Sequence, residues 1–357
     1  MAIAQKRSIV TPRIGAVPLL LRRASSHFLV RRLLRAFFTI FFVATCTFWL
    51  VHLMPGNPVE VYVNGQITQG IPAEQARQQA ASLFAIDLDA PLWQQYVTCL
   101  GDMARGDMGM SIIRQGSSVS TIILEYLPWT LFSVGIGLMI SFVGGVLLGI
   151  LAAYKRETWI DHLLSNTLAT VQAVPNYLIA ILLLVYLGVR WEVIDIAAMR
   201  GTLSPGVHPA FSLSFLWDAL YHASLPIFVY ILTSMGSWML AMRASTESTL
   251  NEDYVTAGLA RGLRPAKVAV SYVGRNAILP LFTQLMIAVG FSVGGSLLIE
   301  QIFSYQGIGS MLATAIGQRD YPLIQGILLT ITTSVVVVNL VADLLYSRLD
   351  PRLRKGS

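Results

Sequence analysis

The sequence predicts an all-α, polytopic membrane protein with six transmembrane helices. Hydrophobic residues make up 55% of the 357 residues and charged residues only 12%, whereas soluble domains contain about 25% charged residues. The mean hydropathy is +0.63. A helix rising about 1.5 Å per residue needs about 20 apolar residues to cross the hydrocarbon of a bilayer. Uncharged segments of about that length or more occupy residues 36–54, 126–154, 163–189, 219–242, 276–299 and 321–342.

Basic residues indicate how the predicted helices are oriented. Nineteen of the 25 Lys and Arg residues lie in the two termini and in the loops 155–162 and 243–275. The alternate segments hold the other six. Cytoplasmic loops carry an excess of Lys and Arg. We therefore expect both termini and the 243–275 loop in the cytoplasm, and the 55–127 segment outside it.

The two ends of the chain are predicted to be basic cytoplasmic tails, at residues 1–32 and 348–357, flanking a transmembrane domain at 33–347. No acidic residue precedes Glu60, and Arg-rich, acid-poor leaders can be organellar transit peptides. The retained tail is the favoured interpretation, because its charge lies where positive-inside orientation places it.

The extracytoplasmic segment 55–127 follows an abrupt helix end, because Pro55, Gly56 and Pro58 cannot extend the first helix. Residues 72–84 and 93–103 have the pattern of amphipathic helices. Two interpretations remain open for this segment. It is either a cap over the helices or a landing surface for an extracytoplasmic partner.

Several chemistries are not indicated. None of the four lysines follows a glycine, so the chain has no phosphate-binding loop and is not itself an ATPase. Cys46 and Cys99 lack metal-ligand spacing, and His52 and His222 are interpreted as structural. We predict no catalytic residue, no metal ligand and no nucleic-acid binding, since positive-inside orientation accounts for the basic excess.

A secondary transporter working alone would need a charged relay and usually contains inverted repeats. Near a span end, Asp343 has Asn339 one turn earlier, which favours a structural polar contact over a proton site. Gly290 and Gly294 in the fifth span are spaced for close helix packing. A lone transporter and a non-transporting scaffold or receptor are thus the weaker alternatives.

The loop between the fourth and fifth spans contains a short stretch with helix-forming residues, 253–263. Tyr254, Ala257 and Leu263 would supply a compact apolar contact surface, and Gly262 would end the helix where a positive φ costs little. Gly258 would weaken the helix by about 1 kcal/mol relative to Ala. A helix lying against the membrane face suits docking by another protein, although an ordinary amphipathic loop helix is the alternative.

The stretch EDYVTAGLARGL at 252–263, followed by RNAILP at 275–280, resembles the EAA loop of ABC importer permeases. It is similar to the form found in the dipeptide/oligopeptide (DppB/OppB-like) permease family, although Thr256 and Gly258 depart from the EAA pattern. Further segments that resemble the same family are residues 106–111, 127–128, 300–309, 319–322, 325–326, 339–346 and 349–352.

The resemblance implies a type I ABC importer permease fold in a bacterial or archaeal plasma (inner) membrane. It implies a heterodimer with a second homologous permease, two ABC ATPase subunits that bind ATP and Mg, and an extracytoplasmic substrate-binding protein. The chain itself would be no enzyme and would bind no cofactor. The residues expected in the ATPase-coupling helix are Asp253, Tyr254, Ala257, Gly258, Arg261, Gly262 and Leu263.

The resemblance also implies a function, the import of di- or oligopeptides along a path walled partly by the second, fourth and fifth spans. Nickel, glutathione or oligosaccharide carried by the same machine is the alternative. The 300–309 segment lies just outside the fifth span. The residues expected there in an outer gate or binding-protein contact are Glu300, Phe303, Tyr305, Gly307 and Gly309.

Overall fold

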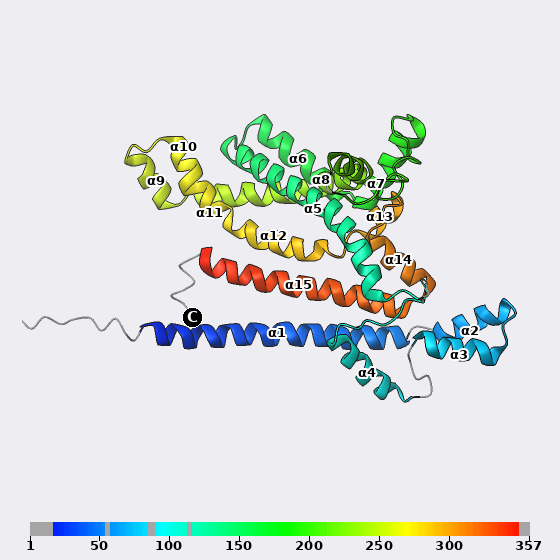
Figure 1. The fold of residues 1–357 in the computed structure, drawn as a ribbon. Coiled ribbons are helices and arrows are strands. Elements are labelled where there is room, and N and C mark those ends of the chain that lie inside the picture. The colour runs from blue at the N-terminus through cyan, green and yellow to red at the C-terminus, as the bar shows by residue number, and fades with distance from the viewer. Residues whose placement is uncertain are drawn as a thin grey trace, which may run out of the picture.

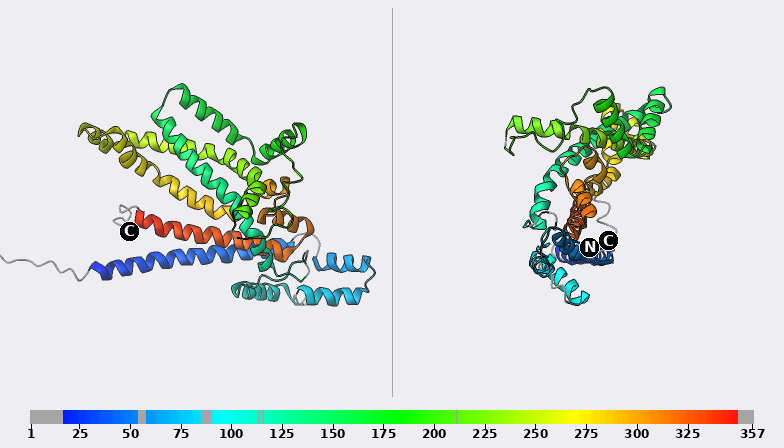
Figure 2. Two further views of the ribbon diagram at one scale, coloured as in Figure 1. Left: turned by 45° about the horizontal axis from the view of Figure 1, so that its top comes forward. Right: turned by 90° about the vertical axis from the view of Figure 1, so that its right-hand side faces the viewer.

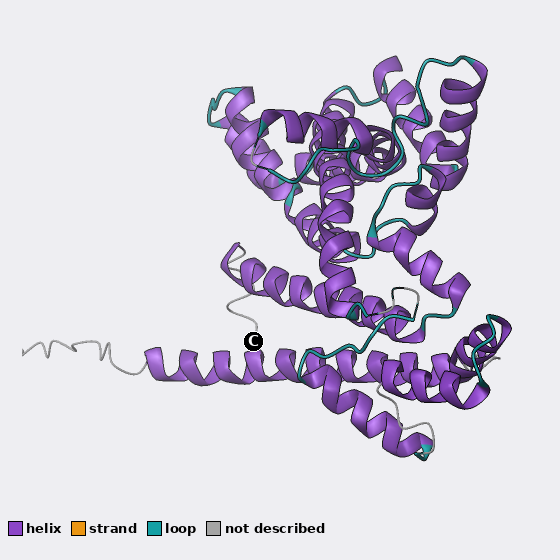
Figure 3. Cartoon of the chain, turned by 45° about the vertical axis from the view of Figure 1, so that its right-hand side comes forward, coloured by secondary structure: helices purple, strands orange, loops and turns teal. Residues whose placement is uncertain are grey.

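The computed structural model describes residues 17–53, 58–84, 90–112, 114, 116–210 and 212–349. Throughout this part of the chain the regular secondary structure is helical, and an isolated bridge between Met110 and Ser118 is its sole β-type pairing. Figure 3 shows helices joined by loops, the longest described one leading from η1 to α8. The all-α prediction is confirmed. The predicted tails fall outside the described residues over 1–16 and 350–357, and α1 runs continuously past residue 32.

The helices follow one another in chain order, with two π-helical segments, η1 and η2, among them. They are α1 (Val17–Leu53), α2 (Pro58–Thr68), α3 (Ala73–Phe84), α4 (Leu92–Ala104), α5 (Val119–Tyr154), α6 (Trp159–Ala173), α7 (Asn176–Leu183), η1 (Leu184–Arg190), α8 (Leu213–Leu250), α9 (Asp253–Ala260), α10 (Pro265–Lys267), η2 (Val268–Gly274), α11 (Arg275–Ala277), α12 (Leu279–Ser292), α13 (Leu297–Ile302), α14 (Ile308–Gln318) and α15 (Tyr321–Leu349).

Four helices among the described residues are each long and apolar enough to cross a membrane: α1, α5, α8 and α15. Two further apolar stretches are bent. The helix α6 meets α7 and η1 at 92°, and the α10–η2–α11 stretch meets α12 at 46°. Counting each bent pair as one span gives up to six spans in this part of the chain.

The predicted third and fifth spans are therefore not single straight helices. Pro175 has no N–H and restricts its predecessor, so Val174 is extended (φ −80°, ψ 127°) and α6 ends there. In the fifth, α12 ends at Ser292 and Gly295 has a φ of +63°. The last residues of the predicted run consequently belong to α13.

The packing of α5 on α8 is the most extensive between any two described helices. Gly137, Ser141, Gly145 and Gly149 recur every fourth residue along α5 and are buried. A Cβ at Gly145 would lie 2.5 Å from Trp238 Cβ and 2.9 Å from the Met235 carbonyl oxygen. Small residues at this spacing let two helix backbones approach closely.

The remaining long helices form a row beside this pair, with α12 on α15 and α15 on α1 (Figure 1). A Cβ at Gly290 would lie 3.0 Å from Val335 Cα, and one at Gly294 3.3 Å from Ile331 Cδ1. The predicted packing role of these two glycines is confirmed, since both face α15.

The structure has two distinct ends, seen in Figures 1 and 2. The first turn of α1, the last turn of α15 and α9 lie toward one end, which we call the α9 end. The helices α2, α3 and α14 lie toward the other, the hairpin end. The predicted helices at 72–84 and 93–103 are confirmed as α3 and α4, whereas α2 was not predicted. The α2–α3 hairpin packs through Val63, Ala76 and Ala80.

Candidate functional site: the α9 helix and the Glu300 pocket

The helix α9 follows α8 after a two-residue turn and ends at a glycine. Gly262 has a φ of +76°, and its N–H donates to the Leu259 carbonyl at 2.9 Å. The N–H of Leu263 donates to the Gly258 carbonyl at 3.3 Å. These two bonds form a Schellman motif, so the predicted helix end at Gly262 is confirmed.

One face of α9 packs against its own chain. Val255 is 2% exposed and Gly258 is buried, and Val255 packs with Val268 and Val273 of η2. Tyr254 and Leu263 lie at the edge of this cluster and are half-buried. The hydroxyl of Tyr254 also accepts a hydrogen bond from Asn276 Nδ2 at 3.1 Å. Tyr254 and Leu263 therefore fix α9 to the following segment.

The other face of α9 is exposed. Its exposed residues are Asp253, Thr256, Ala257, Leu259 and Ala260, with Arg261 and Gly262 following them. Leu259 is 49% exposed and gives this face its largest apolar side chain. The sequence analysis did not include Leu259 in the contact surface, since local pattern does not show which side of α9 the rest of the chain covers.

Gly258 points toward its own chain. A Cβ at this position would lie 3.6 Å from Leu263 Cδ1 and 3.8 Å from Val268 Cγ2. Both distances are ordinary van der Waals separations, so an alanine fits. The glycine is not required for packing within the chain.

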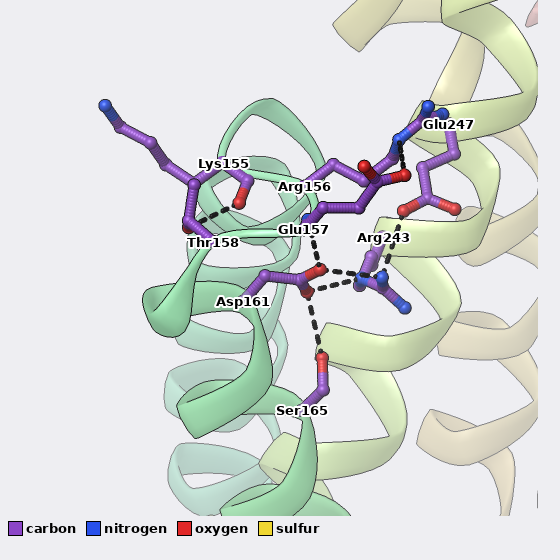
Figure 4. A network of polar contacts seen from close by, with 8 residues as sticks. All are labelled: Lys155, Arg156, Glu157, Thr158, Asp161, Ser165, Arg243 and Glu247. Carbon is purple, nitrogen blue, oxygen red and sulfur yellow. Dashed lines mark hydrogen bonds and ion pairs between the residues drawn. The ribbon is translucent and has the colours of Figure 1, made fainter.

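A polar network joins the last turns of α8, the helix that precedes α9, to the start of α6 (Figure 4). The Asp161 carboxylate, 2% exposed, accepts a hydrogen bond from Arg243 Nη2 at 2.9 Å and forms an ion pair with Arg243 Nε at 2.7 Å. The Ser165 hydroxyl and the Glu157 N–H each donate to Asp161 at 3.2 Å. Arg243 also pairs with Glu247 at 3.2 Å. The sequence analysis did not predict this network, because its central pair, Asp161 and Arg243, is 82 residues apart in the chain.

The predicted outer-gate residues come together near the hairpin end, around the buried carboxylate of Glu300. Its Oε1 accepts from the Thr130 hydroxyl at 3.0 Å, and its Oε2 accepts from the Ser310 N–H at 2.9 Å. The N–H of Ile308 donates to Thr130 Oγ1 at 2.7 Å. Glu300 thus joins α13, the N-terminus of α14 and α5. Burial raises the pKa of its carboxyl to about 7, although the donated hydrogen bonds oppose that rise.

Glycines make room for this carboxylate. A Cβ at Gly295 or Gly307 would clash with a Glu300 carboxylate oxygen, and one at Gly309 would lie 3.0 Å from Oε2. Phe303 is 6% exposed and Tyr305 1%, and the Tyr305 hydroxyl donates to the Trp129 carbonyl at 3.1 Å. All five predicted residues are therefore buried within this chain, and a gating role for them stays a prediction.

Two of the resembling segments, 106–111 and 319–322, also meet. The buried Asp320 carboxylate accepts from the Ser111 hydroxyl and from the Ile112 N–H at 2.8 Å, and also from the Leu323 N–H at 3.1 Å. The loop after α4 is thereby attached to the start of α15. Among the residues interpreted as structural, His222 is 3% exposed, with Nε2 3.2 Å from Ser204 Oγ. The side chains of His52 and Asp343 lie outside the described residues.

Comparison with known proteins finds a matching family and relatives that align with most of the chain. Residues 145–355 match the family model described as "Binding-protein-dependent transport system inner membrane component". The chain is 32% identical over 338 residues to the di/tripeptide transport system permease protein DppB of Pseudomonas aeruginosa, covering 92% of this chain and 98% of that protein.

Two further relatives are similar over nearly their whole length. The dipeptide transport system permease protein DppB of Escherichia coli K12 is 31% identical over 347 residues, with 92% of this chain and 98% of that protein covered. The oligopeptide transport system permease protein AppB of Bacillus subtilis is 29% identical over 327 residues, with 91% and 98% covered. The residues matched by the family model include α9 and the part of the Glu300 pocket formed by α13 and α14, whereas Thr130 of α5 lies before them.

Proposed function

The chain belongs to the family of binding-protein-dependent transport system inner membrane components, and from this premise we propose that it is a permease subunit of an ATP-driven ABC importer. Its cargo is di- or oligopeptides delivered by an extracytoplasmic binding protein. The proposal on cargo is supported by the names of relatives that align with more than nine-tenths of this chain. The chain provides a route across the membrane and catalyses no reaction.

The observation that carries the proposal is the two-sided character of α9. Its buried side, at Val255 and Gly258, is fixed to η2, while Leu259, 49% exposed, and its neighbours on the other side are open to a partner. We assign this exposed face to the ATPase. A force applied there reaches α8 directly and reaches α6 through the Arg243–Asp161 pair.

The proposed topology has six spans, with α6–α7–η1 and α10–α12 each serving as one bent span. Both termini and α9 face the cytoplasm. The clustering of α9, the start of α1 and the end of α15 at one end supports this arrangement (Figure 2), as does the excess of Lys and Arg in the corresponding segments.

The remaining partners complete the machine. A second homologous permease supplies the other half of the path, and two ATPase subunits hold ATP and Mg. The segment from α13 to α14 serves as an outer gate that moves as one body with α5, because Glu300 and Thr130 join them. The binding protein determines most of the cargo specificity. Uptake assays that compare binding proteins specific for peptide, nickel, glutathione or oligosaccharide therefore distinguish these cargoes.

The test is reconstitution of the purified complex in proteoliposomes, followed by ATP hydrolysis and peptide uptake. We expect Leu259→Asp to abolish peptide-stimulated hydrolysis and uptake, because a carboxylate replaces the apolar centre of the exposed face. Leu259→Met, which keeps that surface apolar, should retain most of both activities.

Peptide uptake that is unchanged in Leu259→Asp would contradict the assignment of this face to the ATPase. Uptake that needs no ATPase would contradict the importer proposal itself. Uptake of nickel, glutathione or oligosaccharide, with none of peptide, would contradict the cargo alone.

A further inference from the structure

The helix α4 (Leu92–Ala104) has three distinct sides. Its apolar residues cover a broad arc, and the polar residues Gln94, Thr98 and Asp102 lie on the opposite side. Part of the apolar arc packs on the protein, while the rest is exposed. Leu92 is 51% exposed, Trp93 67% and Val97 58%.

The protein-facing side of α4 is held by two long helices. The Tyr96 hydroxyl lies 2.8 Å from Thr45 Oγ1 of α1, and its ring lies 5.3 Å from that of Phe48. On α15, Gln325 Nε2 donates to Cys99 Sγ at 3.6 Å. These contacts fix the rotation of α4, so Trp93 and Val97 are directed away from the protein by its packing.

The contact with α1 also gives the depth of α4. Thr45 lies inside the apolar stretch Val30–Leu50, five residues before its end, which corresponds to about 7 Å along a helix. The ring of Trp49 lies 6.4 Å from that of Tyr96. Trp and Tyr side chains concentrate at the boundary between headgroups and hydrocarbon, and Trp49, Trp93 and Tyr96 together fit that pattern.

We propose that α4 is a membrane-interfacial helix, with Trp93 and Val97 inserted among lipid acyl chains and Gln94, Thr98 and Asp102 in the headgroup region. On α1, Trp49, whose ring lies 6.4 Å from that of Tyr96, and Leu50 are exposed too, so we assign them to the same lipid-facing surface as Trp93 and Val97. An amphipathic helix lies in the interface in this way, with its apolar face in the acyl boundary. The inference rests on the proposed membrane topology and sets the height of the α2–α3 hairpin above the bilayer.

The test is the accessibility of nitroxide labels in the assembled complex, reconstituted in nanodiscs of phosphatidylethanolamine and phosphatidylglycerol. Cys46→Ala and Cys99→Ser remove the native thiols, the serine keeping an acceptor for Gln325, and single labels are placed by Trp93→Cys, Val97→Cys, Thr98→Cys and Phe42→Cys. Thr98 is the matched control on the polar side of α4. Phe42, 57% exposed on α1, is the control for the span itself.

We expect the ratio of collisions with oxygen to collisions with a water-soluble nickel chelate to be several-fold higher at 93 and 97 than at 98. The apolar face of an interfacial helix lies among acyl chains, where apolar oxygen dissolves and the chelate does not. Equal ratios at 97 and 98, with a lipid-exposed label at 42, would overturn the inference and leave the topology intact. Labels at 93 and 97 shielded from both reagents would also overturn it, in favour of a protein partner on this face. A label at 42 that faces water would contradict the proposed topology.

Discussion

The guanidinium of Arg243 binds the buried carboxylate of Asp161 through two nitrogens, at 2.7 Å and 2.9 Å. Arg243 lies two turns before the end of α8, and Asp161 lies in the first turn of α6. Because α9 follows α8 after a two-residue turn, the Arg243–Asp161 pair links the candidate coupling helix α9, through α8, to α6. In the proposed function, a displacement of α9 by the ATPase would move both α8 and α6.

Arg243→Gln should destabilise the chain and weaken coupling. Removing one partner of a buried ion pair costs about 3–5 kcal/mol, and the lower end applies because the Arg243 side chain is 29% exposed. The matched control is Arg156→Gln, whose exposed pair with Glu157 at 3.5 Å contributes at most about 1 kcal/mol. Thermal unfolding in detergent and peptide transported per ATP measure the two effects. Equal melting temperatures and equal peptide transported per ATP in the two variants would contradict a role of Arg243 in linking α8 to α6.

Gly258→Ala should leave transport intact and stabilise α9. The added methyl would contact Leu263 and Val268 at ordinary distances, and an alanine in a helix is favoured over glycine by about 1 kcal/mol. Peptide uptake and thermal unfolding are the measurements. Loss of uptake with normal stability would mean that a partner protein approaches the backbone at Gly258. That result would contradict the finding that Gly258 faces the chain's own η2.

Stability should depend on pH through Glu300. Burial raises the pKa of its carboxyl to about 7 from an ordinary 4.5. Between these values the folded chain holds a proton that the unfolded chain releases, so the stabilising contribution is lost as pH rises through about 7. Glu300→Gln is uncharged and lacks this dependence.

The melting temperature of the wild type minus that of Glu300→Gln should therefore fall as pH rises from about 4.5 to about 7 and stay level above that. Thermal unfolding of both proteins at several pH values measures this difference. A difference that grows with pH would mean that the pocket favours the ionised carboxylate.

Gly149→Ala should push α5 and α8 apart. A Cβ there would lie 2.5 Å from the Met239 carbonyl oxygen and 2.7 Å from Met242 Cβ, and overpacking of this kind costs about 1–3 kcal/mol. Gly135→Ala is the control on the same helix, because a Cβ at Gly135 meets nothing within 4 Å. Thermal unfolding of the two variants should separate them. A Gly135 variant as destabilised as the Gly149 variant would argue against close packing as the cause.

The sequence was sufficient for the helical class and for the apolar stretches, because charge-free runs of bilayer length are a strong signal. Absence of charge alone did not show whether each apolar run forms one straight helix. Pro175 and Gly295 break two of them, and both residues were visible in the sequence. The 92° bend at Pro175 depends on packing against other helices, which a count of charges does not include.

For the candidate site, local chemistry was predictable and long-range partners were not. The helix end at Gly262 follows from backbone sterics. The pairs Asp161–Arg243 and Glu300–Thr130 join residues 82 and 170 positions apart, and local pattern carries no information about either. The predicted contact surface was Tyr254, Ala257 and Leu263, because local pattern does not show which side of α9 the following segment covers. In the structure η2 lies against Val255 and Gly258 and leaves Leu259 49% exposed.

The most direct test of the central claim is photo-crosslinking from α9 in native membranes. A benzoylphenylalanine placed at Leu259 should form, on irradiation, an adduct with a P-loop ATPase identified by mass spectrometry. The same residue placed at Leu213, 88% exposed at the opposite end of α8, should give no ATPase adduct. Absence of an ATPase from the Leu259 adducts, or equal yields from both positions, would contradict the account of α9 as the coupling helix.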